Sequence, residues 1–376
     1  MNNWKETTLG EVVEFQRGFD LPVQNRTHGE YPLIVSNGIE GFVNEYKVNG
    51  PGVITGRSGT LGKVFFVKEN YWPLNTTLWI KDFKGNDERF IYYWLLNFPF
   101  EKFNAGSGVP TLNRNHIHPA PVTIPESIKE QKVIAANLSS FDDKIELLRR
   151  QNKTLGSIAR TIFKEWFVNF TVNGQKLKVN SKTGMPDGWT QKGLGEIADF
   201  LNGLALQKYP PKNETDVLPV IKIRELKAGI TEQTDKASKQ IDPEYIVDNG
   251  DVIFSWSGSL DVVLWCYGKG ALNQHLFKVT SKKCPKWFYY YWTIEHLPFF
   301  KSIAKAKATT MGHIQRHHLA EALVAIPDDD FMAFADGKIK PIFEHIILNN
   351  SQIQTLSNLR DALLPKLMKG EIRVKL

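Results

Sequence analysis

The sequence is poor in the features that would place the chain outside the cell or in a membrane. It has only two cysteines, Cys266 and Cys284, which are too few for a disulfide framework and lack the spacing of a metal site. No run of about 18 uncharged apolar residues occurs, and residues 1–15 contain no apolar stretch. We therefore expect neither a membrane-spanning helix nor a secretion signal, and we expect a cytoplasmic protein.

Catalytic and cofactor motifs are also missing. Residues 56–63 do not form a phosphate-binding loop, because Leu61 stands where its second glycine is required. Tyr209 precedes a Pro-Pro pair where an adenine-methylating motif has Asn or Asp, and no G-x-G-x-x-G loop opens a helix. A histidine group has no cysteine or acidic residue suitably near: His313, His317 and His318. The sequence predicts no catalytic residue, no cofactor-binding residue and no metal site.

Excess charge is scarce in most of the chain. The net charge is +7, but residues 1–127 carry −1 and residues 171–330 carry +2, whereas 128–170 and 331–376 carry +3 each. A basic balance permits a polyanionic partner without proving one. If DNA is bound, the two large regions must bind it through local clusters and shape.

The chain does contain a long internal repeat, in which one unit occurs twice. Trp4 followed by Leu9-Gly10-Glu11 recurs, at a shift of 185 residues, as Trp189 followed by Leu194-Gly195-Glu196. Further matches continue along the chain while the shift drifts only to 202 residues. Long internal self-similarity indicates repeated structural units, and each copy is large enough to fold alone. We expect a covalent pseudo-dimer whose natural partner has two parts.

Each copy combines short strands with an aromatic helix. The first has β-rich runs at 52–55, 64–67 and 77–80 before a helix at 90–97. The second has strands near 217–223, 251–254 and 276–280 before a helix at 287–294. The pattern predicts a mixed α+β module used twice. The aromatic residues of the first helix are better explained as core than as a platform for stacked bases: Phe90, Tyr92, Tyr93 and Trp94.

A long helix is predicted after each module. Apolar positions alternate at spacings of four and three from Ile134 to Trp166, and again from Ile339 to Leu367. Globular helices average only about 11 or 12 residues, so this length favours an antiparallel coiled coil over two separate amphipathic helices. The predicted seam comprises Leu138, Phe141, Ile145, Leu148, Asn152, Leu155, Ile162, Ile339, Ile342, Ile346, Ile353, Leu356 and Leu363.

Polar residues and a proline interrupt these seams. Asn152 and Asn349 each lie within the apolar seam of their own helix, where a single amide can fix register and orientation. Pro365 should kink or thin the final turns of the second helix. The two helices are expected to act as a spacer between the modules.

Turns that differ between the copies are candidates for specific recognition. Residues 56–60 read Gly-Arg-Ser-Gly-Thr, and the matching residues 255–259 read Ser-Trp-Ser-Gly-Ser. Asn75-Thr76-Thr77 likewise corresponds to Asn273-Gln274-His275. A constant frame with changed donors and acceptors is what two readers of different base sequences need. For any single residue, ordinary drift of a surface loop is the alternative.

A second pair of loops closes the modules at 104–116 and 305–318, where backbone amides and hydroxyls suit phosphate oxygens. Arg114 and Arg316 could pair with phosphate or reach guanine. The candidate DNA-binding residues are Arg57, Ser58, Thr60, Asn75, Thr76, Thr77, Ser107, Asn113 and Arg114 in the first copy, and Trp256, Ser257, Ser259, Asn273, Gln274, His275, Lys305, Lys307, Thr309, Gln315 and Arg316 in the second.

The order repeat, spacer, repeat, spacer resembles the specificity subunit of type I restriction-modification enzymes along essentially the whole chain. The resemblance is carried by the two Trp and Leu-Gly-Glu motifs, by Gln131-Lys132 and Ile145 in the first heptad segment, by residues 162–167 (Ile-Phe-Lys-Glu-Trp-Phe), and by residues 364–372 at the end of the second spacer. Each motif is weak alone, but together, in this order and twice over, they are strong.

The resemblance implies two target-recognition domains, at 1–127 and 189–327, related by a pseudo-twofold axis. A spacer helix at 128–170, a linker at 171–188 and a second spacer helix with a tail at 328–376 complete the chain. Each domain would read half of a split sequence in double-stranded DNA. The helices would fix the gap and dock two methyltransferase subunits, which bind S-adenosylmethionine, and nuclease-translocase subunits can join.

The implied role is non-catalytic, and two other functions stay open on the residues alone. A stand-alone methyltransferase or nuclease is disfavoured by the missing motifs. The near-neutral modules favour the other alternative, a bivalent scaffold that binds proteins and not DNA. One departure from the repeat is the acidic run at 328–330, which has no counterpart at the start of the first spacer.

Overall fold

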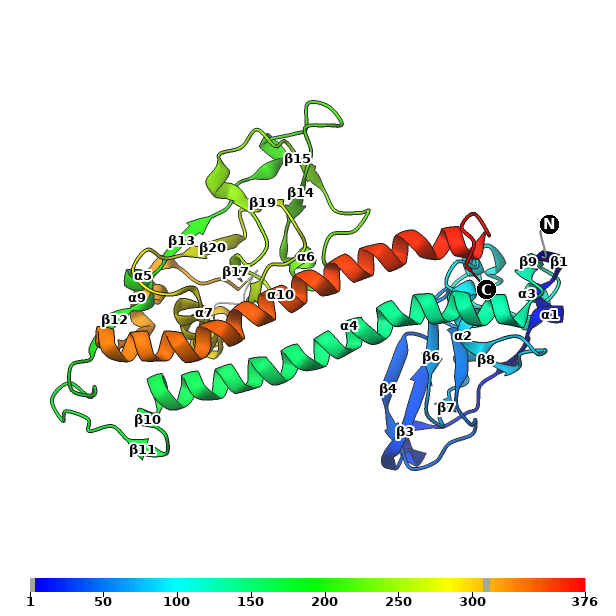
Figure 1. The fold of residues 1–376 in the computed structure, drawn as a ribbon, viewed down its shortest axis with the longest axis horizontal. Coiled ribbons are helices and arrows are strands. Elements are labelled where there is room, and N and C mark those ends of the chain that lie inside the picture. Colours follow the sequence, from blue (N-terminus) through cyan, green and yellow to red (C-terminus); the bar gives the residue numbers. More distant parts are fainter. Residues whose placement is uncertain (1–3, 307–311, 376) are drawn as a thin grey trace. The chain divides into compact units, whose positions relative to one another are not determined.

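The computed structural model describes residues 4–306 and 312–375 (Figure 1). Its contacts divide the chain into two compact units. Unit 1 comprises Met1–Lys144 and Leu356–Leu376, and unit 2 comprises Ile145–Thr355. Each unit therefore holds one copy of the repeat together with part of each long helix. Within the described ranges, no helix is both long and apolar enough to cross a membrane.

The first module, in unit 1, is built on two sheets. Its strands are β1 (Trp4–Thr8), β2 (Glu14–Arg17), β3 (His28–Val35), β4 (Gly38–Val43), β5 (Gly52–Gly56), β6 (Val64–Val67), β7 (Trp72–Pro73), β8 (Thr77–Asp82) and β9 (Pro121–Pro125), and its helices are α1 (Leu9–Val12), α2 (Glu88–Leu95) and α3 (Arg114–Ile117). An antiparallel sheet has the order β2-β8-β5-β6, and a smaller mixed sheet has the order β4-β3-β7. β1 and β9, the first and last strands of the module, pair with each other in antiparallel orientation.

The second module, in unit 2, repeats this plan. Its strands are β12 (Thr190–Gly193), β13 (Asp199–Asn202), β14 (Leu218–Ile221), β15 (Lys236–Ala237), β16 (Ile246–Val247), β17 (Val252–Ser255), β18 (Asp261–Leu264), β19 (Gly270–Leu272), β20 (Leu276–Thr280) and β21 (Leu323–Ile326), and its helices are α5 (Leu194–Ile197), α6 (Ile223–Ala228), α7 (Lys286–Glu295), α8 (Leu297–Ala306) and α9 (Arg316–Glu321). The sheet orders are β13-β20-β17-β18 and β15-β14-β19-β16, with β12 paired to β21.

The two modules share strand order as well as sequence. β13, β20, β17 and β18 match β2, β8, β5 and β6 in order and in antiparallel pairing. In both second sheets a parallel pair, β3 with β7 or β14 with β19, adjoins the antiparallel neighbour β4 or β15. The predicted α+β fold with two similar modules is confirmed.

Two long helices pass through both units. α4 (Ile128–Phe163) ends in a π-helical turn (Lys164–Val168), and α10 (Asp329–Met368) closes the chain; a short hairpin, β10 (Thr171–Val172) with β11 (Gln175–Lys176), follows α4. Within unit 2, the amide of Asn152 contacts Ile346 and Asn350, whereas the Trp166 ring lies 5.3 Å from that of Phe334. Asn152 thus contacts residues 346 and 350, whereas Trp166, further along the chain, contacts Phe334, nearer the start of α10. The predicted antiparallel pairing is present (Figure 1).

Each module buries its own end of the helix pair in its core. In unit 1, Ile134 and Leu138 of α4 and Leu367 of α10 join the apolar core beneath the first module. In unit 2, Phe163 of α4 and Ile339 of α10 join the core of the second. The aromatic helix α2 is core, as predicted: Phe90, Tyr93 and Trp94 are 0%, 1% and 8% exposed.

Polar contacts anchor the modules to the helices at defined points. In unit 1, buried Gln131 donates to Asn86 Oδ1 and to the Pro125 carbonyl, at 2.8 and 2.9 Å. Asp142 accepts from Tyr93 Oη and from Arg360 Nη1, at 2.5 and 2.6 Å. Burial, and then the contact with Asp142, raises the pKa of Tyr93 and keeps its hydroxyl a donor. In unit 2, Trp287 Nε1 of α7 donates to Asp336 Oδ1 of α10 at 2.7 Å.

The predicted seam residues differ in burial. Fully buried members are Leu138, Ile145, Leu148 and Ile339; partly buried members are Phe141, Asn152, Leu155, Ile162, Ile342, Ile346, Ile353, Leu356 and Leu363. Asn349, which is 3% exposed, donates from Nδ2 to Asn152 Oδ1 at 2.9 Å. The two seam amides therefore bond to each other.

Pro365 lies inside α10 and does not end it. α10 continues past this proline to Met368, and the amide of Lys369 still donates to the Pro365 carbonyl at 3.1 Å. The final turns are therefore not lost. Gly370, at φ +68°, ends the helix in the left-handed conformation that glycine adopts without strain.

Candidate functional site

The turn that follows the central strand of each module is held by the same main-chain bonds. In the first module, the amide of Gly59 donates to the Pro110 carbonyl at 2.9 Å; in the second, Gly258 donates to Gly312 at 2.9 Å. The amide of Leu112 likewise donates to the Arg57 carbonyl at 2.8 Å. Its counterpart is the Ile314 amide donating to the Trp256 carbonyl at 3.0 Å. Because the bonds are main-chain, the frame does not depend on which side chains it carries.

A glycine brings a third segment against each turn. A Cβ on Gly18 would lie 2.2 Å from the Leu74 carbonyl oxygen, and a Cβ on Gly203 would lie 2.3 Å from that of Asn273. No real Cβ approaches a backbone oxygen this closely, so both positions require glycine. The end of β2 or β13 is thereby held beside the turn that precedes β8 or β20.

In the first module, these three segments enclose a cavity of about 680 Å³. Arg17 and Asp20 form one side, where they pair at 3.5 Å, and Arg57 and Arg114 also line the cavity. Arg57 Nη1 donates to the Asn75 carbonyl at 3.1 Å, which fixes its direction. Burial, and then repulsion from Arg17, lowers the pKa of Arg57, whereas Asp20 raises it. Three guanidinium groups against one carboxylate make the cavity a local basic cluster in a module of net charge −1.

In the second module, the equivalent segments enclose a cavity of about 370 Å³ with different chemistry. Asn202, Trp256, His313 and Arg316 line it. Trp256 Nε1 donates to Asn202 Oδ1 at 3.0 Å, and the indole stacks on Phe277 at 5.6 Å between ring centroids. Arg316 also donates to the Phe200 carbonyl at 3.4 Å.

A comparison of matched lining residues shows which side chains the two cavities have in common and which differ. Asn113-Arg114 is matched by Gln315-Arg316, so an amide followed by a guanidinium is kept. Arg57 is replaced by Trp256, Arg17 by Asn202 and Thr111 by His313. One frame thus presents a charged, hydrogen-bonding surface in the first module and an aromatic and imidazole surface in the second. The kept Arg suits an acidic oxygen or a base edge, and the changing groups suit discrimination.

Several predicted residues meet in these cavities. In the first module the structure brings Arg57, Asn113 and Arg114 together, and Asn75 lies beside them, donating to Asp20. In the second it brings together Trp256, Gln315 and Arg316. Ser58 and Thr60 are partly buried in the turn after β5, and Thr76 is partly buried in the turn before β8. Ser107, Ser259 and Lys305 are exposed outside the cavity walls. Lys307 and Thr309 lie outside the described residues.

Three predicted residues have structural roles instead. Thr77 is fully buried, and its hydroxyl donates to the Leu74 carbonyl at 2.7 Å. The expectation that Thr77 contacts DNA is therefore corrected, because its polar group is already used within the turn. Ser257 is 4% exposed and hydrogen-bonds His275 Nδ1 at 3.1 Å, and buried Asn273 accepts from the His275 amide at 3.3 Å. Both hold His275 in place.

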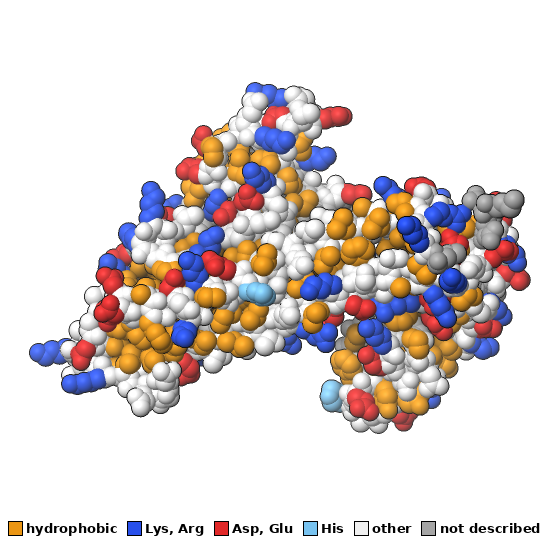
Figure 2. Space-filling model, in the orientation of Figure 1, with side chains coloured by type: hydrophobic (Ala, Val, Ile, Leu, Met, Phe, Trp, Pro, Cys, Tyr) orange, Lys and Arg blue, Asp and Glu red, His pale blue; other side chains and the backbone are white. Residues whose placement is uncertain are grey.

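Sequence reasoning missed Arg17, Asp20 and Asn202. The repeat itself carried the signal for the first and last, since the shift of 185 residues that aligns Trp4 with Trp189 also aligns Arg17 with Asn202. Among the described residues, no three His, Cys, Asp or Glu side chains are grouped to hold a metal ion. On the face drawn in Figure 2, basic and acidic side chains are interspersed over each unit, so the cavity clusters are local.

Comparison with known proteins identifies the family. A family model described as the type I restriction modification DNA specificity domain matches residues 1–156 and 186–356. The chain belongs to this family. The two matched ranges correspond to the two copies of the repeat, so the type I specificity domain is present twice.

Relatives agree with this assignment. The type I specificity subunit MjaIX of Methanocaldococcus jannaschii is 27% identical over 323 residues, covering 81% of this chain and 74% of the relative. The MjaVIII specificity subunit of the same organism is 22% identical over 406 residues, covering 99% and 94%. A crystal structure of a type I S subunit from M. genitalium covers 100% of this chain and 97% of its own, with a TM-score of 0.66 at 14% identity, which shows the shared fold.

Family membership settles the general role. Specificity subunits of type I restriction-modification systems are non-catalytic and provide DNA recognition within a complex of several subunits. This chain is such a subunit, and the absence of catalytic motifs in its sequence agrees with that role. The cavities described above are its candidate DNA-reading sites.

Proposed function

We propose that the two cavities are the centres of two DNA-reading surfaces, each of which recognises one half of a bipartite target in double-stranded DNA. Residues 1–127 and 189–327 form the reading domains, with 171–188 as their linker. The single observation that carries the proposal is the common backbone frame with different side chains at matched wall positions. Two modules that recognised the same bases would not need different side chains at these positions.

The kept and changed residues have different proposed tasks. Arg114 and Arg316 contact phosphate or guanine in both half-sites, because a guanidinium matches either bidentately. Arg57 and Arg17 read bases in the first half-site, whereas Trp256, Asn202 and His313 contact the second. Phosphate contacts set affinity and register, and base contacts set sequence.

The spacer helices, at 128–170 and 328–376, set the gap between half-sites and dock two methyltransferase subunits. Those subunits bind S-adenosylmethionine and methylate adenine, and nuclease-translocase subunits can join the assembly. Exposed apolar side chains on both helices support docking, with Leu147, Ile158 and Leu348 exposed by 40%, 44% and 63%. Removing one heptad from a spacer should change the tolerated gap and leave base identities unchanged.

Methylome sequencing tests the reading sites. Cells that express the chain with its methyltransferase partner should show one bipartite motif, absent without the chain. Arg57→Ala should relax bases only in one half of that motif, and Trp256→Ala only in the other. A matched control is Lys5→Ala, an exposed cation on β1 that lines neither cavity. If either variant altered both halves equally, or altered neither, the assignment of one cavity to each half-site would be wrong.

A bivalent protein scaffold is the second candidate, because residues 1–127 and 171–330 carry net charges of only −1 and +2. A gel shift on random duplex DNA, with the methyltransferase partner present, separates the two functions. DNA recognition predicts a complex that weakens steeply with salt as counterions are reabsorbed. A scaffold predicts no salt-dependent shift.

A further inference from the structure

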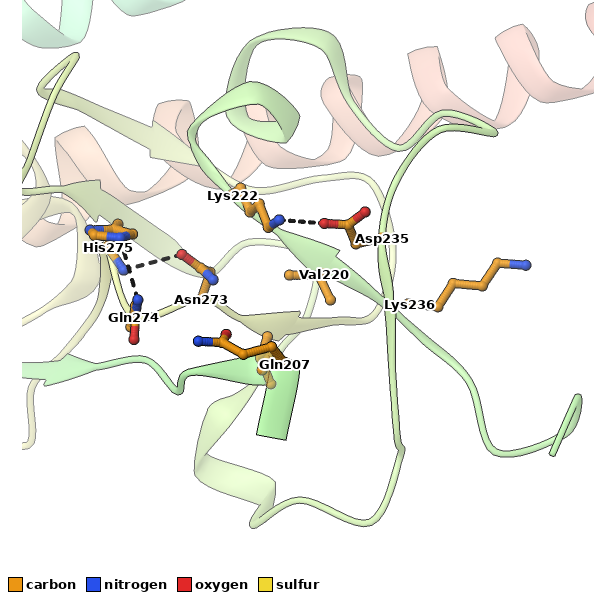
Figure 3. Close-up of a pocket in the computed structure, with 9 residues that line it drawn as sticks. Gln207, Val220, Lys222, Asp235, Lys236, Asn273, Gln274 and His275 are labelled. Atoms are coloured by element: carbon orange, nitrogen blue, oxygen red, sulfur yellow. Dashed lines mark hydrogen bonds and ion pairs between the residues drawn. The ribbon is translucent and has the colours of Figure 1, made fainter. Parts of the chain in front are cut away.

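A second hollow in unit 2 lies next to the cavity that Trp256 lines. It has a volume of about 500 Å³ and lies between the ends of β14 and β15 and the turn before β20 (Figure 3). Gln207, Lys222, Asp235, Gln274 and His275 are among its lining residues. The imidazole of His275 also lies 6.1 Å from the Trp256 ring, between centroids. The hollow is therefore continuous with the surface around the Trp256 cavity.

Two buried carboxylates hold the outer wall of the hollow in place. Glu225, which is 1% exposed, accepts from the Lys222 amide at 3.1 Å and from Thr234 Oγ1 at 3.3 Å. Asp216, which is 7% exposed, accepts from Ser238 Oγ at 2.7 Å and from the Lys239 amide at 2.8 Å. Through Glu225 and Asp216, these bonds hold the segment that contains Lys222 against the segment that contains Asp235. A wall fixed in this way is suited to recognition, because little ordering remains to be done on binding.

The inner wall is held equally firmly by the backbone. The amide of Asn273 donates to the Ile221 carbonyl at 3.2 Å, and the amide of Gln274 donates to the Leu204 carbonyl at 2.9 Å. His275 is held by Ser257 and Asn273, as described above. Figure 3 shows Gln274 and Gln207 directed into the space beneath Asn273 from different segments. Gln274 Nε2 lies 3.5 Å from His275 Nε2, at the upper limit of a hydrogen bond, so this weak contact orients the amide and a base acceptor would replace it.

The chemistry of the hollow favours a nucleobase over a phosphate. Lys222 is paired with Asp235, so its charge is largely neutralised within the protein. Lys236 also lines the hollow, but its side chain extends away from the other labelled residues in Figure 3. The Asp235 carboxylate and the two glutamine carbonyl oxygens are acceptors, and a phosphodiester offers no donor to them. A base edge offers both kinds of group: adenine presents the N6 amino donor beside the N7 acceptor. Glutamine matches this pair with its own carbonyl and amino groups.

We propose that this hollow is a base-reading subsite of the second module, in which Gln274 recognises adenine in one A·T pair and Gln207 supports it from the opposite wall. This inference rests on the proposed DNA-reading function and adds one base pair to the half-site of the second module. Gln274 is a specificity-determining residue here, whereas Lys222 and Asp235 position the outer wall.

Methylome sequencing of cells expressing the chain with its methyltransferase partner tests the subsite. Gln274→Ala should lower discrimination at one A·T position of one half-site by roughly 5- to 150-fold, the range for one bidentate base contact. The other half-site and the gap should not change. Gln207→Ala changes an exposed residue, so we expect it to leave the fold intact and to weaken the same position. The control is Gln240→Ala, an exposed amide outside the hollow that accepts from Lys212 at 2.7 Å.

Three outcomes would overturn the inference. An unchanged motif in both glutamine variants would show that no base is read here. Uniform weakening at all sequences, with a shallower salt dependence of binding to a duplex pool, would show a phosphate contact. If the unaltered chain gave no bipartite motif, the proposed function itself would fail, and the subsite with it. In the first two outcomes the proposed function would survive.

Discussion

The paired amides in the helix seam give a prediction that the structure makes quantitative. Asn349 is 3% exposed and donates to Asn152 Oδ1 at 2.9 Å, while Asn152 Nδ2 donates to Asn350 Oδ1 at 2.7 Å. Asn349→Ala removes the donor but leaves the acceptor in an apolar seam. Leaving one buried polar group unsatisfied costs about 1–3 kcal/mol. The helix pair in unit 2 should therefore open more readily.

Hydrogen exchange measured by mass spectrometry reports this opening locally, which matters because a chain of two units need not unfold in one step. A cost of about 1–3 kcal/mol corresponds to exchange roughly 5- to 150-fold faster in peptides covering the seam on either side of Asn152. Asn137→Ala is the matched control, because Asn137 is exposed on α4 and its amide donates to the Val133 carbonyl of the same helix at 2.8 Å. That variant should change stability by less than about 0.5 kcal/mol.

A double-mutant cycle sharpens the test. Removing both Asn152 and Asn349 eliminates the orphaned partner, so the double variant should lose less than the two single variants together, by about 0.5–3 kcal/mol. Strict additivity, or equal exchange in Asn349→Ala and Asn137→Ala, would refute the idea that these amides are coupled in the seam.

Three further results are expected. Gly18→Ala should destabilise unit 1 by at least about 1–3 kcal/mol, because its Cβ would overlap the Leu74 carbonyl, whereas Gly41→Ala in the same module meets nothing within 4 Å and should be nearly neutral in urea unfolding. Phe163→Ala should cost about 3–5 kcal/mol in thermal unfolding, since the ring is 1% exposed in the core of unit 2; a loss below about 1 kcal/mol would contradict this packing. Burial raises the pKa of the Cys266 thiol, so at pH 8 the native protein should react with iodoacetamide far more slowly at this residue than the urea-unfolded chain, and equal rates would show that the thiol is accessible.

Local patterns in the sequence predicted the long helices and several strands well. The heptad spacing identifies α4 and α10 because it records burial along a single helix, and no distant contact is needed to interpret it. Pro341 shows the limit of such rules, since it lies inside α10 although proline removes a helical donor. Packing of Ile339 and Phe343 in the core of unit 2 offsets this local cost.

The sheet pairing and the cavity walls could be predicted only in part. The order β2-β8-β5-β6 joins segments that are far apart in the chain, and strand propensity alone does not specify partners. Arg57 and Arg114 were found because each lies in or shortly after a glycine-rich segment of the sequence. Arg17 was missed because it is the last residue of an ordinary strand, β2, and only the approach allowed by Gly18 brings it to the cavity. Thr77 was misassigned because burial of a turn residue depends on the strands around it.

The main-chain bonds that hold both turns have an evolutionary consequence. A mutation that replaces Arg57 or Trp256 alters what the surface prefers but leaves the main-chain hydrogen bonds of the turn in place. New preferences should therefore arise by single codon changes and survive in lineages with little loss of stability. Since each turn is tied within its own module, the two halves are free to diversify independently.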